Sequence, residues 1–212
     1  MSKKVPTTPV NKGKVIGQKR PFTPKQIRRI KSVLGKSANQ GSQKALRDLA
    51  LLAVSIDTML RGCDLLRLTK TDVTDHKGRI LPEFTVFQQK TKKGVLVALS
   101  PETRIIVMRW LTVTKKCQGD YLFISTRKRS TTPLTTAQYR RLVKYWATLA
   151  QVDIRYYSGH STRRTKAALV YEKTRDVEVV RELLGQKSTA ATSAYLNIGK
   201  RRALEIAKRI KL

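Results

Sequence analysis

The chain has 212 residues, 40% of them hydrophobic, so it can bury a core as one domain or two small ones. Its 45 lysines and arginines outnumber its 14 acidic residues, and the net charge of +31 would strain a compact fold by self-repulsion unless a polyanion offsets it. These numbers exclude a largely disordered chain and favour a folded protein that binds nucleic acid.

Cysteine content and apolar runs limit the cellular context. Cys63 and Cys117 are the only cysteines, too few for a disulfide framework or a zinc site with suitable spacing, so we expect two reduced thiols. No apolar run approaches the length of a membrane span and no signal peptide opens the chain. We therefore expect no membrane partner and a cytoplasmic protein associated with the nucleoid.

The amino terminus is basic and rich in proline. Four of the seven prolines fall in the first 24 residues, and 13 lysines and arginines precede the first acidic residue, Asp48. Such a segment cannot bury enough apolar surface to order itself. We predict that residues 1–20 form a disordered basic arm that could follow DNA phosphates, and a solvated tail with no specific role is an equally good interpretation.

Two helices are predicted next. Thr23 and Pro24 have the pattern of an N-cap and a first helical residue, and Gly35 is the predicted end of that helix. Its predicted apolar side is Ile27, Ile30 and Val33. Ser42 is the predicted cap of a second, core helix that ends at Arg61 and Gly62. Its apolar residues recur at helical spacing: Leu46, Leu49, Ala50, Ala53, Ile56 and Leu60.

After the short segment Leu65–Leu68 the period of the pattern changes from helix to strand. Phe84 and Val86 alternate with other residues, and so do Val95, Val97 and Leu99. Residues 91–94, which include two lysines and a glycine, lie between these two runs. The pattern predicts a β-hairpin.

The chain then returns to helical spacing. Ser100 and Pro101 begin a helix whose predicted apolar side is Ile105, Ile106, Met108 and Leu111. A short strand is predicted for Leu122–Ile124, and Thr135 or Thr136 caps a helix that carries Tyr139, Leu142, Val143, Trp146 and Leu149. The fold class is therefore mainly α with a small antiparallel β-sheet (α+β).

The stretch from Gly159 to Leu196 carries the best candidates for chemistry. His160 and Arg163 are three residues apart in a predicted helix, so both side chains can lie on one face. An apolar helix, Val177–Leu184, follows and reaches Gly185 at its carboxyl end. Tyr195 then lies in a short helix rich in serine, threonine and alanine. A proton-transfer group, a fixed cation and a phenol are thus close in sequence.

Four motifs along the chain resemble the catalytic domain of the tyrosine recombinase (phage integrase) family. In order, they are LRGCDLLRLTKTDV, QQKTKKGVLVALS, SGHSTRR and LLGQKSTAATSAYL, and the match extends from Ser42 to Ile198. Each motif is weak alone, but four in the right order at sensible separations are specific. The resemblance implies a function in DNA recombination or integration, as in mobile genetic elements, on double-stranded DNA.

In that family two arginines, a hairpin lysine, a histidine and a second histidine or tryptophan surround a DNA phosphate that a tyrosine attacks. By resemblance, the catalytic residues of this chain are Arg61, Lys90, His160, Arg163, Gln186 and Tyr195. Gln186 departs from the pattern, because the family usually has histidine or tryptophan there, and we expect reduced activity. The product would be a 3′-phosphotyrosyl bond, and the reaction implies no metal and no other cofactor.

Physical chemistry supports these roles, with alternatives beside them. Two guanidinium groups suit the charge that develops on a phosphodiester in its transition state. Arg61 could instead complement a helix carboxyl terminus, His160 could be a buried structural histidine, and Tyr195 could be a core aromatic. Lys90, the predicted general acid, competes with Lys92 and Lys93 at the same hairpin.

The resemblance also suggests an organisation into a basic arm (1–20), a catalytic domain (21–198) and a carboxyl-terminal helix (199–212). Residues 200–212 have an apolar side that could dock on a neighbouring subunit or pack on its own domain. We expect a homo-multimer on DNA, with accessory DNA-bending proteins as possible partners. A type IB topoisomerase-like enzyme, a non-catalytic DNA-binding relative and a basic RNA-binding protein are the alternatives.

Overall fold

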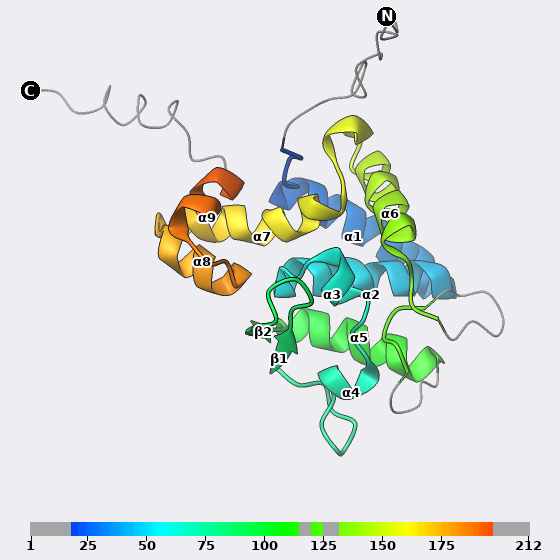
Figure 1. Cartoon of the computed structure of the whole chain (residues 1–212). Coiled ribbons are helices and arrows are strands. Elements are labelled where there is room, and N and C mark those ends of the chain that lie inside the picture. Colours follow the sequence, from blue (N-terminus) through cyan, green and yellow to red (C-terminus); the bar gives the residue numbers. More distant parts are fainter. Residues whose placement is uncertain (1–17, 115–119, 125–131, 197–212) are drawn as a thin grey trace, which may run out of the picture.

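The protein is mainly helical with one small antiparallel sheet, as predicted (Figure 1). The computed structural model describes residues 18–114, 120–124 and 132–196. The helices and strands of these ranges are α1 (Pro24–Asn39), α2 (Gln43–Thr58), α3 (Gly62–Leu65), α4 (Lys70–Val73), β1 (Glu83–Phe87), β2 (Gly94–Ala98), α5 (Pro101–Thr114), α6 (Thr136–Leu149), the 3₁₀ turn η1 (Ile154–Tyr156), α7 (Gly159–Thr174), α8 (Val177–Leu184) and α9 (Thr189–Leu196).

Helix α2 is the centre of the core. Its residues are buried around most of its circumference, and α1, α5 and α7 all pack against it (Figure 1). Leu51 and Leu52 are fully buried, and each such side chain contributes roughly 1.5–3 kcal/mol relative to an exposed one. A helix that is apolar nearly all round must lie inside the fold, and α2 therefore forms the support for the elements around it.

The predicted helix starts agree with the structure. Thr23, Ser42 and Thr135 are the N-caps of α1, α2 and α6, and each side-chain oxygen accepts a hydrogen bond from a backbone N–H of the first turn. In α1 and α6 a glutamine at the third helical position completes a capping box.

Helix α1 runs past Gly35, so the predicted end at this glycine is wrong. The helix continues to Asn39, where Arg109 of α5 donates hydrogen bonds to the carbonyl oxygen of Ala38 (3.1 Å) and to Oδ1 of Asn39 (2.7 Å). These contacts hold the last turn against the cost of a helical glycine. Val33, predicted on the apolar side, is 37% exposed, and the buried residues are Ile30, Leu34 and Ala38.

Helix α2 ends at Thr58, before the predicted end at Arg61 and Gly62. Met59 takes a left-handed conformation with φ of 50° and reverses the chain. Arg61 is instead the residue that precedes α3, and its side chain makes no capping hydrogen bond there. The guanidinium of Arg61 donates a hydrogen bond to Gln88 of the hairpin, and the interpretation of Arg61 as an electrostatic partner for the carboxyl end of α2 stays an alternative.

The predicted hairpin is present. Strands β1 and β2 pair antiparallel, with Phe84 opposite Val97 and Val86 opposite Val95, and these four side chains are buried. No strand forms at Leu122–Ile124 within the described residues, where only isolated bridges join Tyr121 to Thr69 and Ile124 to Pro133.

The predicted apolar side of α5 is only partly right, since Leu111 is buried and Ile106 packs against the core, whereas the other two predicted residues are exposed. Ile105 is 71% exposed and Met108 is 38% exposed. The buried residues are Thr103, Val107, Trp110 and Leu111. Trp110 decides the rotation of the helix, because its ring is buried and its Nε1 donates a hydrogen bond to the carbonyl oxygen of Leu122 (2.8 Å).

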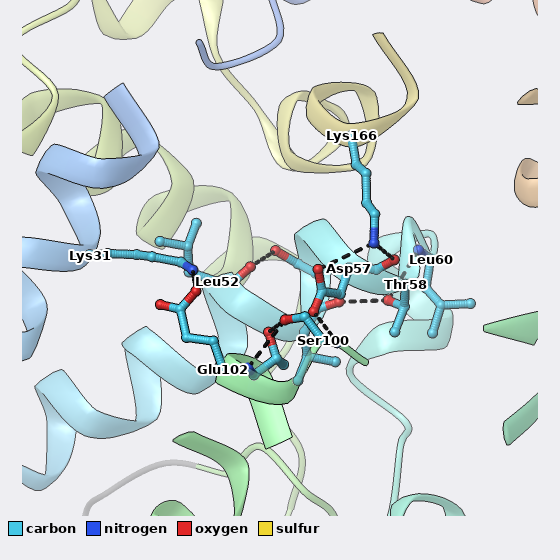
Figure 2. A network of polar contacts seen from close by, with 11 residues as sticks. Lys31, Leu52, Asp57, Thr58, Leu60, Ser100, Glu102 and Lys166 are labelled. Carbon is cyan, nitrogen blue, oxygen red and sulfur yellow. Dashed lines mark hydrogen bonds and ion pairs between the residues drawn. The ribbon is translucent and has the colours of Figure 1, made fainter. Parts of the chain in front are cut away.

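A partly buried polar cluster joins the carboxyl end of α2 to α5 and α7 (Figure 2). The Asp57 cluster consists of Asp57, Ser100, Thr103 and Lys166. One carboxylate oxygen of Asp57 accepts a hydrogen bond from the Ser100 backbone N–H (2.9 Å), and the other accepts from Lys166 Nζ (3.3 Å). Burial opposes ionisation, but hydrogen bonds from Thr103 and Ser100 and the charge of Lys166 outweigh it and lower the pKa of Asp57.

Three further predictions concern composition and the chain ends. Cys63 is a free cysteine, whereas Cys117 lies outside the described residues. Most of the predicted basic arm and the whole of the predicted carboxyl-terminal helix, 199–212, also lie outside them. No helix in the described part of the chain is long and apolar enough to cross a membrane.

Candidate active site

The segments that carry Arg61 and His160 both lie against the same edge of one aromatic ring, that of Tyr139. A Cβ atom on Gly62 would lie 3.1 Å from the ring of Tyr139, and one on Gly159 would lie 3.3 Å from it. The absence of side chains at these two positions lets both segments lie against Tyr139. The Tyr139 hydroxyl is itself hydrogen-bonded to Oγ1 of Thr162 in α7 (2.7 Å), which fixes the ring.

Arg61 is half-buried, and its guanidinium is held by the hairpin. Its Nη1 donates a hydrogen bond to Oε1 of Gln88, whose side chain is 1% exposed. Asp64, in the next turn, is buried and accepts a hydrogen bond from the backbone N–H of Gln89 through Oδ1 (2.9 Å). Two contacts thus tie the α3 segment to the residues just before Lys90.

Arg163 is buried on α7 and points toward the end of α8. Its Nη2 donates a hydrogen bond to the carbonyl oxygen of Leu184 (2.7 Å), whereas its Nη1 has no partner among the described residues. Burial lowers the pKa of Arg163 to about 10, so it still carries a positive charge at neutral pH. A buried guanidinium with an unpaired donor favours the approach of an anion.

His160 lies in the first turn of α7 and is exposed. Partial desolvation, followed by the charges of Arg163, Arg164 and Arg61, lowers the pKa of His160 below its ordinary value of 6.5. The imidazole is therefore mainly neutral at pH 7 and can accept a proton. Its pKa also shows that the charges of three arginines act at this position.

Tyr195, on α9 of the same chain, lies close enough to the arginines to be affected by their charges. Burial raises the pKa of Tyr195 to about 12, and the charges of Arg163, Arg164 and Arg61 counteract part of that rise. The guanidinium carbon of Arg164 is 5.2 Å from the centre of the Tyr195 ring. The Tyr195 hydroxyl is buried and makes no well-aligned hydrogen bond within the described residues, although it is close enough to the Arg163 guanidinium to interact with it.

The electrostatic interactions among Arg61, Asp64, Arg163 and Tyr195 define a cluster, which is called the arginine pocket below. Two cations face one carboxylate in it, and Arg164 adds a third cation at its edge. An anionic diester would offset this excess positive charge and pair with the free donors. A phenol in the same pocket is a nucleophile in the right kind of environment for attack on such a diester.

Each of the two remaining predicted residues comes two positions after a residue that contacts an arginine of the pocket, Gln88 or Leu184. Lys90 is exposed in the connection between β1 and β2. Gln186 follows Gly185 at the end of α8, and its Oε1 accepts a hydrogen bond from Oγ1 of the buried Thr192 (2.6 Å). Because Thr192 is on α9, three residues before Tyr195, Gln186 joins the end of α8 to the helix of the phenol.

Sequence reasoning missed two residues. Arg164 was overlooked beside Arg163, although it contacts the Tyr195 ring. Gln88 was overlooked as well, although the alternation that buries Phe84 and Val86 places it on the buried side of the hairpin. A polar residue at a buried position of a strand was the available signal. No group of three or more potential metal-ligating residues, counting His, Cys, Asp and Glu, occurs in the described ranges.

Comparisons with known proteins give a consistent picture. The family model described as "Phage integrase family" matches residues 20–202. Tyrosine recombinase XerD of Rickettsia conorii is 24% identical over 180 residues, covering 81% of this chain and 58% of the relative. Tyrosine recombinase XerD of Haemophilus ducreyi is 28% identical over 170 residues, covering 77% of this chain and 54% of the relative. The chain thus spans little more than half the length of these relatives.

Solved structures share the fold. XerH site-specific recombinase in a post-cleavage complex with difH substrate superposes with a TM-score of 0.70 at 21% identity, over 90% of this chain and 53% of that one. XerA recombinase has a TM-score of 0.67 at 19% identity, over 99% of this chain and 68% of that one. The predicted fold is confirmed by these likenesses.

Proposed function

The chain belongs to the phage integrase family, and on that premise we propose that it is a site-specific DNA recombinase. It would cleave and rejoin double-stranded DNA through a 3′-phosphotyrosyl intermediate. The observation that carries this proposal is the arginine pocket, in which Arg163 and the Tyr195 hydroxyl are buried close enough to interact, without a well-aligned hydrogen bond at Arg163 Nη1 or at the hydroxyl.

In the proposed cleavage step, Oη of Tyr195 attacks the phosphorus of the scissile diester. The bond from phosphorus to the 5′ oxygen breaks, and a phosphotyrosyl bond forms at the 3′ end. Arg61 and Arg163 bind the non-bridging oxygens as their charge grows. The 5′ hydroxyl of a second strand can reverse the step, because the energy of the broken bond is retained in the new ester.

Two proton transfers accompany this exchange. Since burial raises the pKa of Tyr195 to about 12, its phenol is protonated at neutral pH and must lose the proton as it attacks. His160, with its lowered pKa, is the proposed acceptor. The departing 5′ oxygen needs a proton, and Lys90 is the proposed donor.

The decisive experiment uses a duplex with a nick close to the cleavage site, so that a short 5′-hydroxyl fragment escapes after cleavage. The parent protein should form a covalent adduct that survives denaturing electrophoresis, and Tyr195→Phe should form none while it still binds DNA. Tyr145→Phe is the matched control, because Tyr145 is 45% exposed and far in sequence from the pocket. An adduct with Tyr195→Phe would contradict the assignment.

Exchange between two duplexes separates recombination from simple nicking and resealing. A recombinase should join the 3′ strand of one labelled duplex to the 5′ strand of another. Relaxation of supercoiled DNA without any exchange would favour a type IB topoisomerase-like activity. Binding without any covalent adduct would indicate a non-catalytic relative.

The general acid is tested with DNA that has sulfur in place of the bridging 5′ oxygen. A thiolate departs without a proton, so Lys90→Ala should cleave this DNA at the parent rate and ordinary DNA much more slowly. Lys92→Ala and Lys93→Ala are the matched controls. If Lys92→Ala or Lys93→Ala is slow on ordinary DNA and regains the parent rate on the sulfur-containing DNA, while Lys90→Ala does not, the lysine replaced in that control variant is the general acid.

We further propose that the chain acts as a homo-multimer on paired sites at the nucleoid, with DNA-bending proteins as possible accessories. Residues 1–20 would follow DNA phosphates, 21–198 would form the catalytic domain, and 199–212 would dock on a neighbouring subunit. Deletion of residues 200–212 should weaken assembly on DNA in a gel-shift or light-scattering assay. Unchanged assembly would contradict docking between subunits.

A further inference from the structure

Gln88 is a buried amide that the proposed mechanism does not use. Its side chain is 1% exposed, and it follows Phe84 and Val86 on the core-facing side of the hairpin. An amide loses its hydrogen bonds to water when it is buried, and this cost is recovered only if the fold supplies partners in well-defined positions. The hydrogen-bond partners of the Gln88 side chain therefore indicate which groups offset the cost of burying its amide.

Both ends of this amide are paired. Oε1 of Gln88 accepts hydrogen bonds from Nη1 of Arg61 and from Oγ1 of Thr91 (3.0 Å). Nε2 donates to the carbonyl oxygen of Leu184 (3.3 Å), the same oxygen that accepts from Nη2 of Arg163 (2.7 Å). The two arginines are thus connected through one amide and one carbonyl group.

The end of α8 is shaped for this contact. Gly185 takes a left-handed conformation with φ of 58°, and a Cβ atom there would lie 2.4 Å from Cγ2 of Val95 and 3.0 Å from Nε2 of Gln88. Only a glycine lets the hairpin and the end of α8 approach this closely. The approach brings the Leu184 carbonyl within reach of Gln88.

We propose that Gln88 is a positioning residue for the arginine pair, an inference that rests on the proposed recombinase activity. By accepting from one N–H of Arg61, it fixes the angle of the guanidinium and directs the other donors toward the substrate. Through the shared Leu184 carbonyl, it also sets the position of Arg61 relative to Arg163. Its effect is on binding of the charge in the transition state, not on the proton given to the leaving group.

The first test compares Gln88→Met with Gln89→Met, since methionine keeps the length of glutamine without the amide and Gln89 is an exposed neighbour on the same hairpin. The rate of adduct formation is measured in a single turnover at saturating DNA. Misplacement of Arg61 should slow Gln88→Met by up to about 100-fold, with DNA affinity and Tm close to those of the parent. Gln88→Met at the parent rate, or Gln89→Met slowed as much, would overturn the proposal.

The second test uses the DNA with sulfur at the bridging 5′ position. Because Gln88 acts through the arginines, Gln88→Met should stay slow on this DNA by the same factor as on ordinary DNA. Recovery to the parent rate would mean that Gln88 acts through protonation of the leaving group, and it would overturn the proposal. A merely structural defect would instead lower Tm or DNA affinity, and both are measured beside the rate.

If Gln88→Met fails to fold, Gln88→Asn replaces it. Asparagine keeps the amide but is one methylene shorter, so it cannot reach Arg61 and the Leu184 carbonyl together, and adduct formation should again slow. A parent rate with Gln88→Asn would overturn the inference. The parent protein separates the two hypotheses: with no Tyr195 adduct in the parent the proposed function fails, whereas an adduct unaffected at position 88 removes only the role of Gln88.

Discussion

The Asp57 cluster and the arginine pocket are two partly buried polar clusters, and they are built differently. In the Asp57 cluster, both carboxylate oxygens have donors, and the charge of Lys166 is matched by that of Asp57 (Figure 2). In the arginine pocket, the cations outnumber the carboxylate. Asp64 Oδ2, Arg163 Nη1 and the Tyr195 hydroxyl make no well-aligned hydrogen bond within the described residues, although Arg163 and Tyr195 are close enough to interact.

The difference separates polar groups that stabilise the fold from polar groups that await a substrate. A closed cluster satisfies its own members and stabilises the contacts between helices. An open cluster retains part of its desolvation cost in the free protein, and an incoming anion can recover it. Loss of a group should therefore affect stability in the first cluster and reaction rate in the second.

The sharpest test of that separation is Arg163→Met. Loss of a donor to the transition-state charge should slow adduct formation by roughly 10²–10³-fold, as for other preorganised donors. The free energy of unfolding should not fall, since a buried and partly unpaired cation is replaced by an apolar chain. Single-turnover cleavage and chemical denaturation measure the two effects, and a marked loss of stability would break the comparison.

Asp57→Asn should give the opposite result. The amide N–H₂ would face either the Ser100 N–H or Lys166, so a partly buried donor meets a donor and the free energy of unfolding should fall by roughly 1–2 kcal/mol. Adduct formation at saturating DNA and low temperature should stay close to the parent rate. Thermal and urea unfolding give the first value, and a hundredfold loss of rate would contradict it.

At low pH the parent and Asp57→Asn should have nearly the same free energy of unfolding. The pKa of Asp57 is lowered in the folded state, so its stabilising effect is complete above the unfolded value of 3.8 and is lost as pH falls through the folded value. The gap in free energy of unfolding between the parent and Asp57→Asn should therefore be constant from pH 7 to pH 5 and narrow below pH 3.8. A gap that widens on acidification would show the reverse linkage.

The smallest expected effect is at position 186. Gln186→His introduces the residue type that the family usually has, and cleavage should speed up by a few-fold because an imidazole can donate to the phosphate. Lys187→His is the matched control at the adjacent exposed position. Single-turnover cleavage rates measure this effect. If Gln186→His cleaves DNA no faster than the parent, the result counts against a contact between position 186 and the phosphate.

Local signals predicted where most helices begin, because a capping side chain and its helix are neighbours in sequence. Their ends and rotations depend on distant partners. Gly35 is helical because Arg109 holds the turn that follows it, and α5 turns Trp110 inward because the Leu122 carbonyl lies there. Neither partner could be identified from the sequence of the helix itself.

The candidate site shows the same division. Motif resemblance nominated Arg61, His160, Arg163 and Tyr195, and the structure brings their charges close together. The motif resemblance could not reveal how Arg61 is held. Gln88 is 27 positions away and contacts Arg61 only after the hairpin folds over α3. Alternation in the strand could have exposed Gln88 as an unusual buried amide, but not its partners.

The ring of Tyr139 has a consequence for engineering this protein. Because the backbones at Gly62 and Gly159 both approach the Cδ1–Cε1 edge of this ring, the edge joins two stretches of chain almost a hundred positions apart. Bulk added at one glycine would displace this edge and so disturb the contact with the other. The geometry around Arg61 and that around His160 therefore cannot be redesigned independently. A library that varies position 62 or position 159 without position 139 would mostly contain proteins in which Arg61 and His160 are displaced relative to each other.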